Sequence, residues 1–183
     1  MKYRLITTTY LLLLLMITGC TTIYKTVVDE RDLSTIASDT RIKTTIINGY
    51  IDDENVKTLD IFVAAYDGHV YLVGEYESSN SKKKAIEIAE KVEGVKGTTT
   101  YLLPKKQDDT CGKKVNLSIT AKVKGKLIKD TDIWSTNVDV KTVQCNVVLV
   151  GLVGTKGEKS KAISHAKSVE GVRSVKSFLK PVK

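Results

Sequence analysis

The three cysteines offer the widest range of chemistry in this sequence. Cys20 ends an apolar N-terminal segment, whereas Cys111 and Cys145 lie in the second half of the chain. In an oxidising compartment Cys111 and Cys145 can form a disulfide. Closing a loop of about 34 residues would stabilise the fold by about 3 to 4 kcal/mol. The alternative is two unpaired apolar side chains. A catalytic thiol is not expected, because no His lies near either cysteine in the sequence to activate it.

The other candidate ligands and catalytic groups are too scattered to form a site. We expect His69 to be solvated in a turn and His165 to hold a structural or boundary position on a helix. The histidines and cysteines are not clustered at zinc spacings, and the acidic run at 52–54 lacks the alternating ligands of a calcium loop. Phosphate-binding glycine loops and nucleophile elbows are also missing. The sequence therefore predicts no metal, no cofactor and no enzymatic activity.

Clustered lysines are a better candidate for a functional surface. The chain has 29 basic and 21 acidic residues, a net charge of +8, and its middle contains Lys113, Lys114, Lys122, Lys124, Lys126 and Lys129. Lys122, Lys126 and Lys129 have the spacing of one helix face, and Trp134, the only tryptophan, follows them. Lysine attracts anionic lipid and tryptophan favours the headgroup level of a bilayer. These four are candidate lipid-binding residues. The alternative is a solvated helix face, with Trp134 packed between the two halves of the chain.

The N-terminus resembles a bacterial lipoprotein signal. Its apolar run of about 13 residues is shorter than the roughly 20 that a membrane-spanning helix needs. Residues 16–20, Met-Ile-Thr-Gly-Cys, resemble the lipobox, which implies cleavage after Gly19 and lipidation of Cys20. Thr21, in place of Asp, implies sorting to the outer membrane. Because an exported chain is not expected to meet nucleic acid, anionic phospholipid is the expected counter-charge.

The elements that must position these residues occur twice, with an offset of 77 positions. The segment 92–95, Val-Glu-Gly-Val, recurs at 169–172, and Lys84-Ala85-Ile86 recurs at 161–163. Apolar positions elsewhere align with the same offset and without a gap. Such self-similarity indicates two copies of one structural unit.

Each copy has a readable order of elements. In the first copy, apolar spacing predicts a helix over 40–51 and a second helix over 79–92. Strands are predicted over 59–65 and 70–74, joined by the turn Asp67-Gly68, and a last strand over 95–103. The order is therefore helix, strand, strand, helix, strand.

This pattern resembles the BON domain. The residues that carry the resemblance are Gly74 at the end of the hairpin and Gly94-Val95 before the last strand, with Gly151 and Gly171-Val172 as counterparts. The resemblance implies an α+β fold of two tandem αββαβ modules, phospholipid interaction, support of envelope integrity and no catalysis. The expected organisation is a lipoprotein signal peptide (1–19), a lipidated tether (20–35), BON domain 1 (36–104), a linker (105–112) and BON domain 2 (113–183).

The second hairpin departs from the family pattern. Asp67-Gly68-His69 of the first copy becomes Gln144-Cys145-Asn146, so the glycine that usually supplies a positive φ is missing. Either Asn146 takes the left-handed conformation, or the turn is reshaped around a Cys145 bridge.

The sequence favours a non-enzymatic lipoprotein that is anchored in the outer membrane, faces the periplasm, binds anionic phospholipid and supports envelope integrity. The alternative is a protein-interaction adaptor for an envelope secretion or β-barrel assembly machine. Lipid binding predicts a strong dependence on salt, whereas an adaptor predicts an apolar patch and a specific protein partner.

Overall fold

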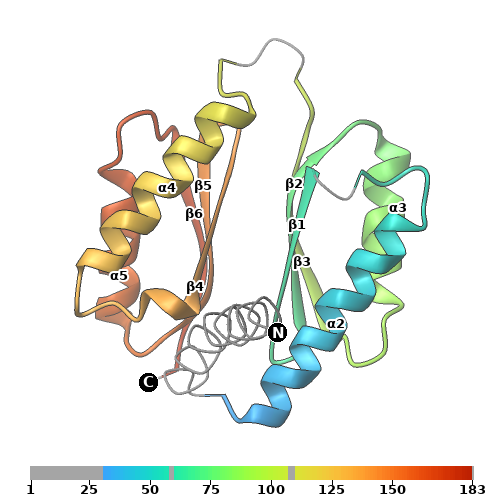
Figure 1. Cartoon of the computed structure of the whole chain (residues 1–183), viewed down its shortest axis with the longest axis horizontal. Helices are drawn as coiled ribbons and strands as arrows, with labels where there is room; N and C mark the ends of the chain where they lie inside the picture. The colour runs from blue at the N-terminus through green and yellow to red at the C-terminus, as the bar shows by residue number, and fades with distance from the viewer. Residues whose placement is uncertain (1–30, 58–59, 107–109, 183) are drawn as a thin grey trace, which may run out of the picture.

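The computed structural model describes residues 31–57, 60–106 and 110–182. The predicted signal peptide, the lipidation site Cys20 and most of the predicted tether lie outside these ranges. Two modules with the same order of elements follow one another (Figure 1). Module 1 consists of α2 (Leu33–Ile51), β1 (Ile61–Tyr66), β2 (His69–Tyr76), α3 (Ser79–Glu90) and β3 (Gly97–Pro104). Module 2 consists of α4 (Lys113–Lys129), the 3-10 helix η2 (Ser135–Asn137), β4 (Val138–Val143), β5 (Asn146–Val153), α5 (Lys156–Lys167) and β6 (Ser174–Pro181). The predicted αββαβ order is confirmed.

Each module has one three-stranded sheet with the order β1-β2-β3 or β4-β5-β6. The first two strands are antiparallel and the last two are parallel, so α3 and α5 are the crossover helices. The register also repeats: Val63 lies opposite Leu72, and Val140 lies opposite Leu149. The 77-residue offset therefore persists down to individual strand pairs.

Capping side chains set the starts of both helices of module 1. The Asp32 carboxylate accepts hydrogen bonds from the backbone N–H groups of Ser34 and Thr35, so α2 begins at Leu33, inside the predicted tether. Ser78 forms a capping box with Ser81, so α3 begins at Ser79. None of the helices in the described part of the chain is both long and apolar enough to cross a bilayer.

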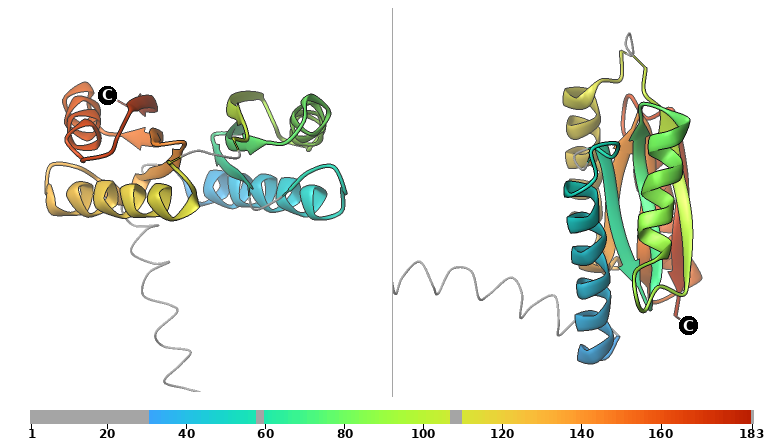
Figure 2. Two further views of the ribbon diagram at one scale, coloured as in Figure 1. Left: turned by 90° about the horizontal axis from the view of Figure 1, so that it is seen from above. Right: turned by 90° about the vertical axis from the view of Figure 1, so that its right-hand side faces the viewer.

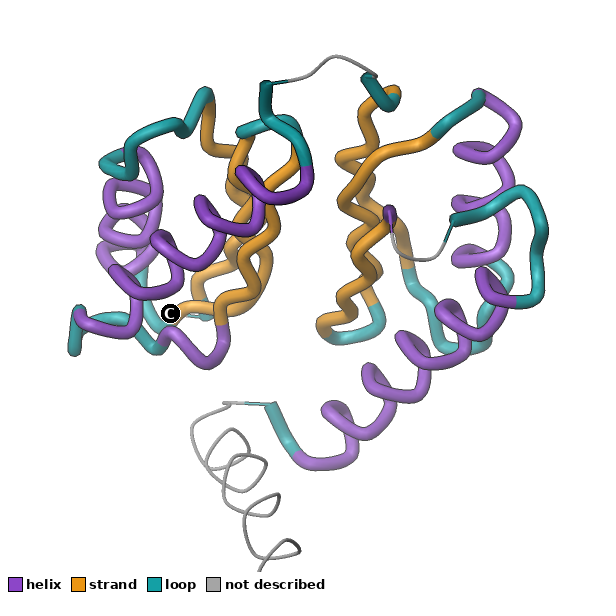
Figure 3. Tube along the Cα trace, turned by 45° about the horizontal axis from the view of Figure 1, so that its top comes forward, coloured by secondary structure: helices purple, strands orange, loops and turns teal. Residues whose placement is uncertain are grey.

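The sheets of the two modules pack face to face, and the helices cover their outer faces (Figures 1 and 3). Viewed from above, α2 and α4 lie in one row along one side of the molecule, and α3 and α5 lie in the other row (Figure 2). Each sheet is consequently buried on both faces. The residues that alternate toward the opposite module form a cluster of Ala64, Tyr66, Tyr71, Val73, Val143, Val148, Val150 and Leu152. Burial on both faces explains the continuous apolar runs of the central strands.

Both hairpins turn through two residues with positive φ. In module 1 these are Asp67 (φ 55°) and Gly68 (φ 77°), and in module 2 they are Gln144 (φ 49°) and Cys145 (φ 60°). Asn146 is instead the first residue of β5, so of the two alternatives for this turn the left-handed Asn146 is ruled out, and the bridged Cys145 lies at the turn. The turn keeps its form because tertiary bonds to Gln144 and Cys145 hold these residues in a conformation that glycine normally supplies.

Candidate functional site

Helix α4 exposes two large apolar side chains, as α2 of module 1 does with Leu33 and Ile51. Ile119, Val123 and Leu127 are buried against the rest of module 2. On the opposite side, Leu117 and Ile128 are 71% and 70% exposed. They are separated by about three helical turns and so lie on one face. These two side chains add apolar area to any contact that this face of α4 makes.

The exposed side of α4 also carries lysines, on a flank turned away from these two apolar side chains. Lys122, Lys126 and Lys129 are exposed and lie together on one flank of α4. Within the described ranges, no acidic side chain lies at ion-pairing distance from any of the three. Lys126 and Lys129 also lie in the last turn, where positive charge is favoured by the helix dipole. The flank is therefore a concentration of positive charge that no carboxylate of the described residues neutralises.

Trp134 lies in the loop after α4, and its side chain is 41% exposed. Its backbone N–H donates a 2.9 Å hydrogen bond to Oε1 of the buried Glu158 at the start of α5. The second oxygen of Glu158 accepts from Gly154 N at 2.6 Å. The carboxylate thus fixes the loop that carries Trp134, while other residues form the contact between the modules.

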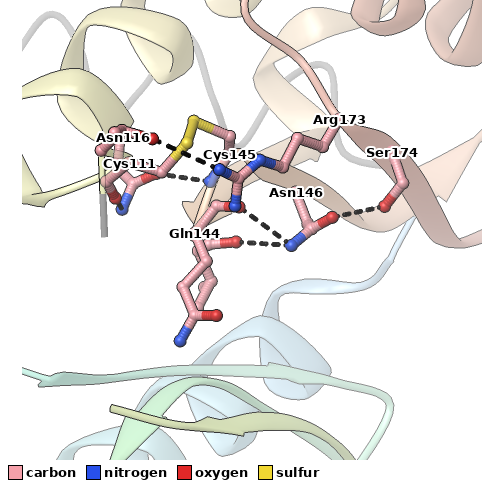
Figure 4. Close-up of a disulfide and its surroundings, with 9 residues drawn as sticks. Cys111, Asn116, Gln144, Cys145, Asn146, Arg173 and Ser174 are labelled. Atoms are coloured by element: carbon pink, nitrogen blue, oxygen red, sulfur yellow. Dashed lines mark hydrogen bonds between the residues drawn. A yellow bond between two sulfur atoms is a disulfide. The ribbon is translucent and has the colours of Figure 1, made fainter. Parts of the chain in front are cut away.

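A disulfide joins Cys111 and Cys145, whose Cα atoms are 5.4 Å apart. Figure 4 shows that it ties the segment just before α4 to the β4–β5 turn. Asn116 of α4 links the same two segments, because its Oδ1 accepts from Cys145 N at 2.9 Å and its Nδ2 donates to Cys111 O at 2.8 Å. Gln144 extends the network to module 1 by donating to Glu75 at 2.9 Å and to the Pro104 carbonyl at 2.8 Å.

An ion-pair cluster connects the linker to both modules. Asp60 of module 1 pairs with Lys105 at 3.0 Å and with Lys113 at 2.9 Å. Burial raises the pKa of Asp60, but the hydrogen bonds from Lys113 and Lys105 outweigh burial and hold the pKa below its ordinary value of 3.8. Beside this cluster lies a cavity of about 280 Å³ between α4, β4 and module 1.

The two histidines occupy structural positions. His69 was predicted to be solvated, and this was wrong: its Nε2 lies 2.8 Å from Thr99 Oγ1, and its ring packs on Tyr71. Burial, followed by the charge of Lys180, lowers the pKa of His69. His165 lies on α5 with Nε2 2.7 Å from Asp130 Oδ2. The described residues contain no cluster of three or more potential metal ligands.

Sequence reasoning missed the residues that hold the hairpin turns. The buried carboxylate of Asp39, on α2, accepts from the backbone N–H groups of Asp67 at 2.9 Å and Gly68 at 2.8 Å, and it pairs with Arg31. Its counterpart 77 positions later is Asn116, which holds the second turn. The offset aligns these two residues, so a search of the repeat for equivalent polar positions could have found them.

Comparison with known proteins identifies the module. The sequence pattern of the BON domain matches residues 38–102 and 117–180. Osmotically-inducible protein Y of Escherichia coli (strain K12) is 33% identical over 144 residues, which cover 78% of this chain and 72% of that protein. Outer membrane lipoprotein DolP of Haemophilus influenzae is 26% identical over 152 residues, which cover 82% of this chain and 78% of that protein. The C-terminal domain of CdsD from Chlamydia trachomatis aligns with 76% of this chain and 96% of its own at 10% identity, with a TM-score of only 0.33.

Proposed function

Because the chain belongs to the BON domain family, with two copies of the domain, we propose that it is a non-enzymatic envelope protein whose second module docks on anionic phospholipid. Cys20 is the proposed lipid anchor, and the outer membrane, on its periplasmic side, is the proposed location. The name of the relative DolP, an outer membrane lipoprotein, supports this location. The proposed role is to support the integrity of the envelope.

The surface of α4 is the observation that carries the proposal. Exposed Leu117 and Ile128 supply apolar area, and the flank of Lys122, Lys126 and Lys129 supplies unneutralised positive charge. Each lysine near an anionic membrane contributes about 1 kcal/mol, so the three together contribute about 3 kcal/mol, which is more than a hundredfold in binding. The equivalent helix of module 1, α2, has only Arg41 and Lys43 over the matching positions.

Co-sedimentation with vesicles tests the docking. Residues 21–183, without the lipid, should bind vesicles more tightly as their phosphatidylglycerol content rises and more weakly as salt is added. The triple variant K122E/K126E/K129E should lose this binding. A matched control, K156E/K159E/K167E on α5, makes the same change in net charge on another helix and should retain it.

Two results would contradict the proposal. Unchanged binding of the α4 variant would remove these lysines from the membrane contact. Absence of binding by the wild-type protein at low salt would leave Cys20 as the proposed membrane attachment and favour the alternative, an adaptor for an envelope assembly, for which cross-linking would identify the protein partner.

A further inference from the structure

The cavity at the junction of the modules borders the proposed docking helix. It is lined by residues of α4, of β4 and of module 1, among them Glu75, Leu117, Lys141 and Val143. Lys141 projects from the face of β4 that is turned toward module 1, and Glu75 projects from the corresponding face of β2. Opposite charges from two modules therefore face one cavity.

Lys141 and Glu75 do not neutralise each other directly. No carboxylate of the described residues lies within ion-pairing distance of the half-buried Lys141 ammonium. Glu75 accepts a hydrogen bond from the neutral amide of Gln144, which positions the carboxylate without cancelling its charge. Asp60, which also lines the cavity, is already paired with Lys105 and Lys113. A cation and an anion thus remain separated across the cavity.

Burial without a direct partner has a cost for Lys141. Desolvation, with a smaller contribution from the charge of Lys113, lowers the pKa of its ammonium, against the attraction of Asp60 and Glu75. A ligand with an anionic group next to Lys141 and a cationic group next to Glu75 would compensate both charges. Leu117 and Val143 offer an apolar wall to the rest of such a ligand.

We infer that this cavity binds a phosphoethanolamine group, with its phosphate on Lys141 and its primary ammonium on Glu75. The choice of a phosphate ester rests on the proposed function, because Leu117 belongs both to the cavity and to the lipid-facing side of α4. A primary ammonium donates hydrogen bonds to a carboxylate, whereas a quaternary ammonium is recognised by aromatic cages. None of the described residues that line the cavity is aromatic. Glycerol headgroups carry no cation for Glu75.

Titration with free O-phosphorylethanolamine, followed by nuclear magnetic resonance of the chain from Thr21 onward, tests the inference. Saturable shifts are expected at the backbone amides of Lys141, Leu117 and Thr142. Phosphorylcholine and glycerol phosphate should bind at least tenfold more weakly. K141M and E75Q should each weaken binding at least tenfold, and unchanged spectra elsewhere will show that both variants are folded.

The variant K122E/K126E/K129E separates this inference from the proposed function, since it should lose vesicle docking and still bind the free compound. Vesicles with phosphatidylethanolamine in place of phosphatidylcholine, at constant phosphatidylglycerol, distinguish a lipid source from a soluble one. Tighter binding to the first vesicle assigns the site to a lipid headgroup, and equal binding assigns it to a soluble phosphoethanolamine ester. Failure of the free compound to shift the cavity residues, equal affinity for phosphorylcholine, or full affinity of K141M would overturn the inference.

Discussion

Replacing the disulfide tests whether the β4–β5 turn is strained. Cys145 occupies the position of Gly68, with a φ of 60°, and a bond to Cys111 holds it there. The bridge closes a loop with a sequence separation of 34 residues. Loop-closure entropy for this length corresponds to about 3.8 kcal/mol at 25 °C. A left-handed conformation costs a residue with a Cβ atom about 1 kcal/mol or more.

These magnitudes predict an order of stability. The variant C111S/C145S should lower the free energy of unfolding by about 4 kcal/mol, because it removes the loop constraint and keeps a Cβ atom at the turn. The variant C111S/C145G also loses the constraint, but it should recover about 1 kcal/mol because glycine adopts positive φ without a steric penalty. Urea unfolding monitored by circular dichroism measures both differences.

Module 1 provides a matched control in the opposite direction. At Gly68 (φ +77°) an added Cβ would lie 2.8 Å from the Gly94 carbonyl oxygen, so Gly68→Ala should destabilise the protein by at least about 1 kcal/mol. Equal stability of C111S/C145S and C111S/C145G would refute the assignment of strain to Cys145. Coincident unfolding of the oxidised and reduced wild-type protein would refute the contribution of the loop.

Three further perturbations have defined outcomes. Asp39→Asn removes the charge that accepts hydrogen bonds from two backbone N–H groups of the β1–β2 turn. It should lower the free energy of unfolding, measured in urea titrations, by about 1.5 to 3 kcal/mol. An unchanged free energy of unfolding would show that the turn is stable without this charge. Tyr66→Phe removes a 2.8 Å hydrogen bond to Asp139 of the other module, and a double-mutant cycle with Asp139→Asn should give a coupling of about 1 kcal/mol, whereas strict additivity would mean that the bond contributes nothing. Asp60→Asn should destabilise the protein at neutral pH, and the difference from wild type should disappear as the pH falls below 3.8, because the pKa of Asp60 is depressed in the folded state; a difference that persists in acid would identify a steric cause.

The repeat made the fold predictable. Because each apolar position of one copy recurs in the other, the helical and the alternating spacing of apolar residues could be checked in both modules. The boundaries were less predictable, because Asp32 starts α2 through hydrogen bonds of its side chain, and apolar periodicity does not record such bonds. His69 was misplaced for a similar reason: its turn was predicted correctly, but its contacts with Thr99 and Tyr71 depend on the pairing of β2 with β3, which the local sequence does not record.

The candidate site was predictable only where it depends on one helix. Lys122, Lys126 and Lys129 share a face because of their spacing alone. The exposed position of Leu117 is different, because it follows from which face of α4 packs on β4. The cavity beside Lys141 could not be predicted at all, since residues of module 1 form one of its walls.

The packing of the two sheets against each other limits the surfaces at which this protein can contact a binding partner. In each module the helices cover one sheet face and the neighbouring module covers the other. Within the described ranges, a partner can therefore reach only the outer helices, the loops, the sheet edges and the junction itself. Substitutions at exposed positions of the outer helices leave the three buried clusters intact, so such positions can differ between the modules while the scaffold stays the same. The lysines of α4 have few counterparts on α2, so two equivalent helices on one repeated scaffold offer surfaces of different charge.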